Sequence, residues 1–433
     1  MHPLERLFRW SSIAVVGASD SSSYGSGPHR ALKDLGFQGR YYPVNPRRTE
    51  VHGLRAYPDA HDVPEPIDMG VVVVGREHVP EAVAACADQG ANSVVVISAG
   101  FRELDQRGAD LQDQLTRLAQ ERNLLLIGPN CFGIASLAHR VAACTASGLA
   151  DTRVGNVGVV SHSGGLLNEV ISYGAARGIG FSHLASTGNE AGLTAADILD
   201  YYVHDPSTDV MLAILESVRA PEAFVRVTER AVAARKPLVV LKLGASERSA
   251  RAALTHTGAL AGSDEVYSAL FRQKGVIRVC DVDELIEAGS LLSGAVEVVR
   301  RRPLERAAVI EISGGGKGLV SDTAEAGGVE LPDLSAETVE RLRPAMPRGI
   351  EASNPLDTGL SWGVREMELL YPLALDALAE QPDIDVIVSR YTVPRDGGLG
   401  PLRQRLSEMK AERDRHPDRL FLILSRTSDR FSD

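Results

Sequence analysis

Ile13-Ala14-Val15-Val16-Gly17-Ala18-Ser19-Asp20 is a short apolar run that ends in glycine and serine, and Tyr24-Gly25-Ser26-Gly27 follows it at the start of a helical segment. This order predicts a buried strand, a tight turn and a helix, which together form the first unit of a parallel α/β sheet. Glycines in such a turn let backbone N–H groups approach a phosphate, and the helix N-terminus favours negative charge. We therefore expect an α/β domain that binds a phosphorylated ligand.

The same alternation of short apolar runs and helical segments continues along the chain and predicts further parallel sheets. The first five strands predict a doubly wound domain that ends near residue 140. A second five-strand pattern, flavodoxin-like in length, follows it, and a third α/β domain begins at 307–312. The expected strands are 13–16, 40–44, 69–74, 93–97 and 124–127 in the first domain, and 157–160, 181–186, 210–215, 238–241 and 276–279 in the second.

The expected domains are residues 1–140, 150–297 and 303–433, which suits a chain of 433 residues. Glycine and serine in Cys144–Asn156 indicate a linker, and the arginine-rich stretch Val298–Pro303 interrupts the α/β pattern. Leu420–Leu424 predicts a strand near the end of the sequence. Either this strand is the last of its sheet or the sequence is truncated, and the sequence leaves both open.

The composition excludes several classes of protein. A net charge of −11 argues against a nucleic-acid partner. The first nine residues lack the apolar core of a signal peptide, and the longest apolar runs are too short to cross a membrane. The four cysteines (Cys86, Cys131, Cys144 and Cys280) form no C-x-x-C pair and are too sparse for a disulfide framework. We expect a cytoplasmic protein with reduced thiols, no membrane association and no metal site.

The end of the second strand distinguishes between two kinds of nucleotide site. An NAD site would show G-x-G-x-x-G and an acidic residue at this strand end, which binds the ribose. Here the sequence is Tyr42-Pro43-Val44-Asn45-Pro46-Arg47, with no acid and with a cation nearby. This difference argues against NAD and favours a more heavily phosphorylated nucleotide.

Two further strand-to-helix turns carry groups suited to phosphate. In Val160-Ser161-His162-Ser163-Gly164-Gly165, hydroxyls and glycines stand at a predicted helix N-terminus, where they form an anion site. Ile312-Ser313-Gly314-Gly315-Gly316-Lys317-Gly318 also suggests phosphate, but the Walker pattern is absent. Glu216 ends a predicted strand at the mouth of its sheet, where ligands bind.

One histidine stands in a loop of small residues, Thr255-His256-Thr257-Gly258-Ala259-Leu260-Ala261-Gly262. The loop follows the strand-like run 237–242 and precedes a helical segment at about 263–274. Imidazole has a pKa of about 6.5, so it is a nucleophile near neutral pH. His256 can therefore carry a covalent group.

The segment from Lys242 to Asp264, KLGASERSARAALTHTGALAGSD, closely resembles the phosphohistidine segment of the NDP-forming acyl-CoA synthetases, relatives of the succinyl-CoA synthetase alpha subunit. IAVVGAS, YPVNP, VVISAGF at 95–101 and IGPNCFGI at 127–134 resemble, in order, four signature stretches of the CoA-binding domain of that family. The resemblance covers nearly the whole chain. It implies a Rossmann-like CoA-binding domain followed by two flavodoxin-like CoA-ligase domains.

The resemblance also implies roles for individual residues. His256 would be phosphorylated, and Glu216 would accept the N–H of one ring nitrogen, which leaves the other nitrogen to attack phosphorus. The phosphoryl group would be bound by Ser161, Ser163, Gly164 and Gly165. CoA would be bound at its phosphates by Gly17, Ser19 and Gly25, at its adenine-nucleotide end by Pro43, Asn45 and Arg47, and near its pantetheine arm and thiol by Ser98, Ala99, Gly100, Asn130 and Cys131.

Three positions leave alternatives open. His162 stands where the family usually has glutamine, and it would either bind phosphate when protonated or simply cap the helix, which we favour. Lys317 replaces the proline of the family's N-x-G-G-P-G loop, and we expect a mainly structural role for it. Cys131 would lie near the thiol of CoA or be a small core residue, and it need not be a nucleophile.

The implied activity is that of the alpha-type part of an acyl-CoA synthetase, which joins a small carboxylic acid to CoA through a phosphohistidine and an acyl phosphate. No stretch matches the family's ATP-grasp module. We therefore expect ATP or ADP with Mg²⁺ to bind to an ATP-grasp (beta-type) subunit or domain, in an oligomer. The rival interpretations are a non-catalytic CoA- or acyl-CoA-binding module with the same fold and a nicotinamide oxidoreductase, which the missing acid disfavours.

Overall fold

The computed structural model describes residues 2–246, 248–249, 263–301, 303–359, 364–392 and 400–426. The chain forms two compact units, Met1–Gly294 and Ala295–Asp433. Every strand expected in the first two domains is present. His256 and the THTGALAG segment lie outside the described residues.

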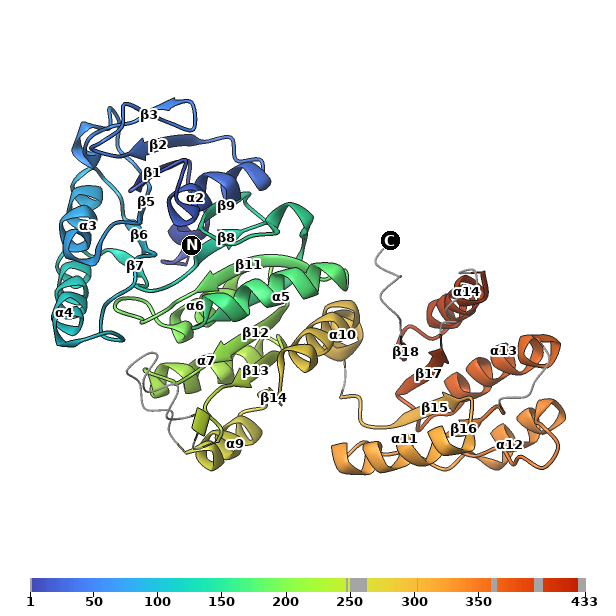
Figure 1. Ribbon diagram of the computed structural model, residues 1–433. Coiled ribbons are helices and arrows are strands. Elements are labelled where there is room, and N and C mark those ends of the chain that lie inside the picture. Colours follow the sequence, from blue (N-terminus) through green and yellow to red (C-terminus); the bar gives the residue numbers. More distant parts are fainter. Residues whose placement is uncertain are drawn as a thin grey trace. The chain divides into compact units, whose positions relative to one another are not determined.

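The first sheet is parallel throughout, with strand order β2-β1-β5-β6-β7. Helices α3 and α4 cover one face and α2 lies on the other (Figure 1). The strand order reverses between β1 and β5, and such a switch point opens a crevice at the carboxyl ends of the strands. The elements are β1 Ser12–Val16, α2 Ser23–Asp34, β2 Arg40–Val44, β3 Glu50–Val51, β4 Leu54–Arg55, η1 Ala60–Asp62, β5 Met69–Val72, η2 Arg76–His78, α3 Val79–Asp88, β6 Ser93–Val96, α4 Gln106–Glu121 and β7 Leu125–Ile127.

The second sheet has the order β14-β13-β12-β10-β11-β8-β9, and it is parallel except for β8 and β9. The connections from β10 to β11 and from β11 to β12 run in opposite directions, so α5 and α6 lie on opposite faces. The elements are β8 Gly133–Ser136, β9 Val141–Cys144, η3 Leu149–Asp151, β10 Arg153–Ser161, α5 Gly164–Ala176, β11 Gly180–Ser186, α6 Ala195–His204, β12 Val210–Leu215, α7 Pro221–Ala233, β13 Leu238–Lys242, α9 Asp264–Gln273, β14 Ile277–Val279 and α10 Val282–Arg301.

The expected linker Cys144–Asn156 is wrong at both ends, because Cys144 is the last residue of β9 and Arg153–Asn156 already belong to β10. Gly155 suggests a flexible link in the sequence, but it lies against Gly180 of β11. A Cβ on Gly155 would be 2.4 Å from the Gly180 Cα. Here glycine permits two strands to approach closely, which is its usual meaning inside a strand.

The strands β8 and β9 were not predicted from the sequence, and they extend the second sheet at its edge. All of their residues are buried, and most are small, so neither strand shows the alternation that identifies a half-buried strand. The short helix α1, Glu5–Phe8, also packs on this part of the molecule. The ring of Phe8 stacks on Tyr201 of α6 with centroids 4.9 Å apart.

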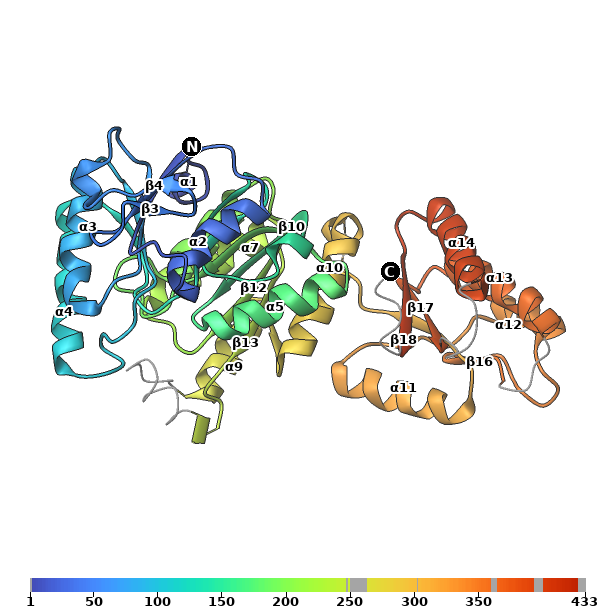
Figure 2. The ribbon, with the colours of Figure 1, turned by 45° about the horizontal axis from the view of Figure 1, so that its top comes forward.

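The unit Ala295–Asp433 contains a parallel sheet with order β16-β15-β17-β18, and the expected strands at 307–312 and 420–424 are β15 and β18. Figure 2 shows α11 on one face, with α13 and α14 on the other. No helix in the described part of the chain is both long and apolar enough to cross a bilayer. The elements are β15 Ala307–Glu311, α11 Gly314–Gly327, α12 Ala336–Leu342, η4 Arg343–Ala345, β16 Leu356–Asp357, α13 Val364–Glu380, β17 Val386–Thr392, α14 Gly400–Arg415 and β18 Leu420–Arg426.

Candidate functional site

The turn after β1 is closed tightly by glycine. Gly17 has a φ of +95°, and a Cβ there would be 2.1 Å from the Val73 carbonyl oxygen, so only glycine fits. A Cβ on Gly25, in the first turn of α2, would be 2.7 Å from the Gly17 oxygen. The Ser22 hydroxyl caps α2 by accepting from the Gly25 amide at 3.2 Å. The half-buried Ser19 hydroxyl is 3.1 Å from that of Ser21.

The end of β2 supports this turn. The Asn45 side chain donates to the Ala18 carbonyl at 2.8 Å and accepts from the Arg47 amide at 2.9 Å. Pro43 is buried inside β2, where it pairs with Val15 of β1, whereas Arg47 is exposed. Asn45 therefore shapes the turn. Of the three residues predicted at the adenine-nucleotide end of CoA, Arg47 is the one that offers an accessible charge.

The loops after β6 and β7 meet at a second point of the crevice. The Ser98 hydroxyl accepts from the Val74 amide at 3.0 Å and donates to its carbonyl at 2.6 Å. The Gly100 carbonyl accepts from Arg76 at 2.8 Å. The Asn130 amide donates to the Ser98 carbonyl at 2.9 Å, which joins the two loops. Hence the Ser98 side chain is already engaged, and Ala99 and Asn130 are the neighbours that present surface to the crevice.

Cys131 is only 4% exposed, and its thiol donates to the Val96 carbonyl at 3.3 Å. Burial raises the pKa of Cys131 to about 12. A thiol with so high a pKa is almost entirely protonated at neutral pH and is a poor nucleophile. This geometry favours the interpretation of Cys131 as a small buried residue at the edge of the cavity.

The turn before α5 has the form expected of an anion site. The Ser163 hydroxyl caps the helix by accepting from the Leu166 amide at 3.3 Å. Ser161 is fully buried, and its hydroxyl donates to the Ser163 carbonyl at 2.7 Å, so it shapes the turn and is not available to a ligand. Gly164 lies against the ring of Phe132, where a Cβ would be 2.4 Å from a ring carbon. The first amides of a helix have no partner within it, and they point toward the space before the turn.

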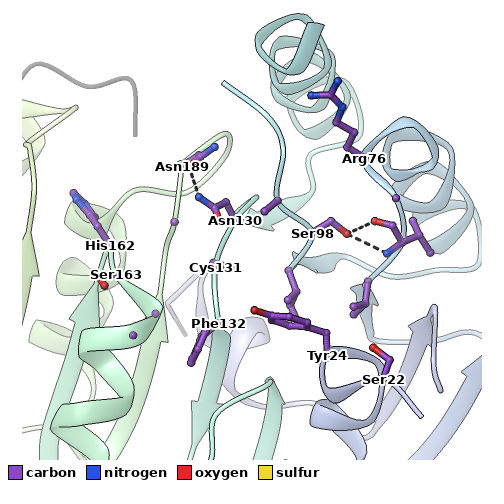
Figure 3. A pocket seen from close by; sticks show the side chains of 18 residues that line it. Ser22, Tyr24, Arg76, Ser98, Asn130, Cys131, Phe132, His162, Ser163 and Asn189 are labelled. Carbon is purple, nitrogen blue, oxygen red and sulfur yellow. Dashed lines mark hydrogen bonds between the residues drawn. The ribbon is translucent and has the colours of Figure 1, made fainter. Parts of the chain in front are cut away.

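A cavity of about 630 Å³ joins these parts. Figure 3 shows His162 and Ser163 on one side, Tyr24, Ser98 and Arg76 on the other, and the segment Asn130–Phe132 between them. Of the predicted site residues, the cavity is lined by Ser98, Ala99, Asn130, Cys131, Ser163, Gly164 and Gly165. The predicted residues outside this lining set are Gly17, Ser19, Gly25, Pro43, Asn45, Arg47, Gly100, Ser161 and Glu216.

Asn189 was not predicted, although it stands in the run Gly188-Asn189-Glu190, shortly after β11 ends at Ser186. It is fully buried and lines the cavity. Its side-chain nitrogen donates to Glu103 at 2.5 Å and to Gln112 at 3.0 Å, and its oxygen accepts from Asn130 at 3.3 Å. Polar residues directly after a buried parallel strand were the signal that could have identified it.

His162 is 7% exposed, and both ring nitrogens are engaged. Nδ1 accepts from the Glu216 amide at 3.1 Å, and Nε2 is 3.0 Å from a carboxylate oxygen of Glu190. The ring does not cap α5, whose N-cap is Ser163, so the interpretation that we favoured from the sequence is wrong. Phosphate binding by His162 stays a prediction. Glu190, which was also missed, is 8% exposed.

Glu216 follows β12 and is buried. Its carbonyl accepts from the ammonium group of Lys242 at 2.9 Å. Lys242 is 5% exposed, and burial lowers its pKa to about 8. The predicted neighbour of Glu216, His256, lies outside the described residues, so the pairing of these two side chains stays a prediction.

In the second unit, the turn before α11 is built from internal contacts. The Ser313 hydroxyl accepts from the Gly316 amide at 3.1 Å, and Lys317 donates to the Ser353 hydroxyl. The Asn354 side chain donates to the carbonyls of Ala307 and Pro332 at 2.8 and 3.0 Å. These contacts fit the structural role expected for Lys317.

Within the described residues, two clusters outside the cavity combine the side-chain types that bind metals, His2–Asp200–His204 and Asp376–Glu412–His416. In each, a carboxylate is already paired with arginine. Asp200 accepts from Arg230 at 2.6 Å, and Asp376 accepts from Arg415 at 2.9 Å. Neither cluster contributes to the lining of the cavity.

Comparison with known proteins places the chain in a family. Residues 11–136 match the CoA binding domain, and residues 154–292 match the succinyl-CoA ligase like flavodoxin domain. The alpha subunit of ADP-forming acetate–CoA ligase II from Pyrococcus furiosus is 32% identical over 403 residues, 92% of this chain and 84% of that subunit. ADP-forming acetate–CoA ligase I from Archaeoglobus fulgidus is 36% identical over 390 residues, 90% of this chain but only 55% of that protein.

A solved structure of a related protein has the same fold. The dinucleotide forming acetyl-coenzyme A synthetase 1 of Ca. Korarchaeum cryptofilum, in complex with phosphate and ADP, is 30% identical, with a TM-score of 0.85. The match covers 98% of this chain and 89% of that one. The chain therefore belongs to the NDP-forming acyl-CoA synthetase family and corresponds to the alpha-type part of these ligases.

Proposed function

We propose that the chain forms or cleaves an acyl-CoA thioester, with a small carboxylic acid, CoA and ATP on one side and acyl-CoA, ADP and phosphate on the other. The cavity of about 630 Å³ carries this proposal, because it joins the loops Ser98–Ala99 and Asn130–Cys131 to the N-terminus of α5. A pantetheine thiol on one side and a phosphoryl group on the other would meet there. The printed names of the relatives, acetate–CoA ligase [ADP-forming], support the same reaction class.

Three transfers would account for the chemistry. A ring nitrogen of His256 takes the γ-phosphoryl group of ATP and releases ADP, and a carboxylate oxygen then takes the phosphoryl group from His256 to give an acyl phosphate. The CoA thiolate attacks the acyl carbon and releases phosphate. Glu216 accepts the other ring N–H of His256 and fixes its tautomer. The amides of Ser163–Gly165 at the start of α5 stabilise the charge on phosphorus.

We further propose that ATP and Mg²⁺ are bound by an ATP-grasp subunit or domain, in an oligomer that acts in the cytoplasm. The Pyrococcus relatives are named as alpha subunits, and the chain spans about half the length of the Archaeoglobus ligase. In-line transfer requires the donor phosphate to be held against the histidine. This chain by itself should then be unable to make acyl-CoA from acid, CoA and ATP.

The test is phosphorylation of the whole chain by acetyl phosphate in the presence of CoA, followed by intact mass. We expect one added phosphate that is labile in acid and absent from His256→Ala. Calorimetry on the same chain should show binding of CoA and none of NAD. A phosphate that persists in His256→Ala would overturn the phosphohistidine. CoA binding without any phosphorylation would favour the alternative, a non-catalytic CoA-binding module.

A further inference from the structure

The peptide groups on both sides of Glu216 are held by buried side chains. Its amide donates to Nδ1 of His162 at 3.1 Å, and its carbonyl accepts from the ammonium group of Lys242 at 2.9 Å. Lys242 also lies over the ring of Tyr267, 4.5 Å from its centroid, and the Tyr267 hydroxyl accepts from the Val218 amide at 3.1 Å. The chain that leaves β12 is thus fixed at successive positions, and the Glu216 carboxylate can move only through its own side-chain torsions.

The hydrogen bonds of His162 define its protonation state. Because Nδ1 accepts the Glu216 N–H, it carries no proton, so in the neutral ring the proton is on Nε2. Nε2 then donates to Glu190 at 3.0 Å. A doubly protonated ring could not accept the Glu216 amide. The contact with Glu216 therefore requires a neutral imidazole in one tautomer.

The carboxylate of Glu190 is held in place by several hydrogen bonds. The oxygen that faces His162 also accepts from the Ala195 amide at 2.6 Å and from the Thr187 hydroxyl at 3.2 Å. Its other oxygen is 3.7 Å from Arg219. Burial raises the pKa of Glu190, but His162, the Ala195 amide and Arg219 together lower it below its usual value. Glu190 is thus a fixed acceptor that selects the tautomer of His162.

We propose that His162 and Glu190 are positioning residues for Glu216, which fix its place beside the phosphorylated histidine through the Glu190–His162–Glu216 hydrogen-bond chain. This inference rests on the proposed function, because it takes Glu216 as the group that orients His256. The proposal also explains how histidine can replace the glutamine that the family usually has at position 162. An amide side chain also offers one acceptor and one donor, so glutamine can make the same two contacts as a neutral imidazole.

The chain offers a matched control in a second buried pair. His183 is fully buried, and its Nε2 is 3.0 Å from Asp205, whose carboxylate also accepts from the hydroxyls of Ser207 and Thr208. Neither His183 nor Asp205 lines the cavity of about 630 Å³. Loss of this pair would disturb a buried histidine and carboxylate without changing the contacts of Glu216.

The experiment compares His162→Gln, His162→Leu, Glu190→Gln and the control His183→Gln. The rate of phosphorylation by acetyl phosphate should fall about tenfold or more in His162→Leu, because a small misplacement of an orienting group is costly. In His162→Gln it should stay within about threefold of the wild type. The Kd of CoA, measured by calorimetry, should change by less than about twofold in Glu190→Gln and His183→Gln, because neither Glu190 nor His183 lines the cavity.

A second readout does not depend on activity. In the whole chain with ¹⁵N-labelled histidine, the signals lost in His162→Gln belong to His162, and they should report the Nε2–H tautomer. Glu190→Gln replaces the fixed acceptor with an amide group that can donate as well as accept, so the preference of His162 for the Nε2–H tautomer should weaken.

Each outcome bears on the proposal. An Nδ1–H tautomer, equal rates in His162→Leu and His162→Gln, or an equal loss in His183→Gln would overturn it. Failure of the wild type to be phosphorylated would instead refute the proposed function, and this inference with it. If His162→Leu does not fold, the tautomer in the wild type and its change in Glu190→Gln still support or refute the hydrogen-bond chain.

Discussion

The turn before α5 and the turn before α11 are built alike but placed in different surroundings. Each follows a buried parallel strand, and each is capped by a serine, Ser163 or Ser313, that accepts from the amide three residues later. Before α5 the space in front of the helix is part of the cavity, whereas before α11 buried and partly buried charges occupy the neighbourhood. Glycine and serine therefore determine the shape of such a turn, and its neighbours determine whether it can bind an anion.

Glu311 shows how the α11 turn is filled. This side chain is fully buried, and it accepts from Arg390 at 2.7 Å and from the Ile312 amide at 2.8 Å. A Cβ on Gly316 would be 2.4 Å from its carboxyl carbon. Glu311 thus lies against the first turn of the helix and supplies a negative charge at the place where an anionic ligand would have to bind.

The largest expected effect is on the turn before α11. Glu311→Ala leaves the guanidinium of Arg390 and the Ile312 amide without their acceptor, and breaking a buried pair in this way costs about 3 kcal/mol. Hydrogen exchange should rise in residues 303–359 and 364–392, while the Kd of CoA stays unchanged. Unchanged exchange there would mean that the pair contributes nothing to the stability of this unit.

Two glycine-to-alanine substitutions, one at the start of α5 and one at the start of α11, test whether the two turns differ in packing. Gly164→Ala pushes a methyl group into the ring of Phe132 and should cost about 1–3 kcal/mol in the free energy of unfolding. Gly315→Ala meets no atom within 4 Å and should stay within about 0.5 kcal/mol of the wild type or be slightly stabilising. Urea unfolding measures both, and equal losses would contradict the difference in packing.

Removing either serine cap should lower the free energy of unfolding by the same amount, but only one of the two changes should weaken phosphate binding. Ser163→Ala and Ser313→Ala each remove one capping hydrogen bond, which costs about 1 kcal/mol. Only Ser163→Ala should also weaken the binding of inorganic phosphate, because only that turn opens into the cavity. Calorimetry with phosphate checks this, and a loss in Ser313→Ala would assign an anion site to α11.

The smallest expected effect concerns Lys317. Lys317→Ala removes one hydrogen bond to Ser353 and should cost about 1 kcal/mol or less. The rate of phosphorylation by acetyl phosphate should not change. If ATP protected the wild type from heat but not Lys317→Ala, the glycine loop at 314–318 would be a nucleotide site, and the distinction between the two turns would disappear.

The sequence predicted the parallel sheets because their strands are continuous apolar runs, such as Met69–Val72 and Val210–Leu215. It missed β8 and β9, whose buried small residues carry no periodic signal. Family motifs indicated the loops that line the cavity. They did not distinguish residues that face it, such as Asn130, from those that shape the turns, such as Ser161 and Asn45. That distinction depends on where a side chain finds its partner, and a motif does not record it.

Glu190 and Asn189 show a second limit of the sequence. Each bonds with residues far away in the chain, Glu190 with His162 and Asn189 with Glu103. Their position shortly after β11 indicates a strand end, but their neighbours in sequence do not show which distant residues they contact. A single sequence shows local patterns well and long-range polar networks poorly, because such networks form only when separate strand ends meet.

Since α1 and β8 both pack with the second sheet, the polypeptide enters the first sheet near Ser12 and leaves it after Ile127, and it crosses between the two layers twice. The chain therefore joins the two sheets covalently at two places, and the hydrogen bonds from Asn189 to Glu103 and Gln112 join them again beside the cavity. A cavity whose walls are connected in this way is held to one spacing by the backbone itself, so a ligand that spans Ser98 and Ser163 should meet two walls already set at a fixed distance.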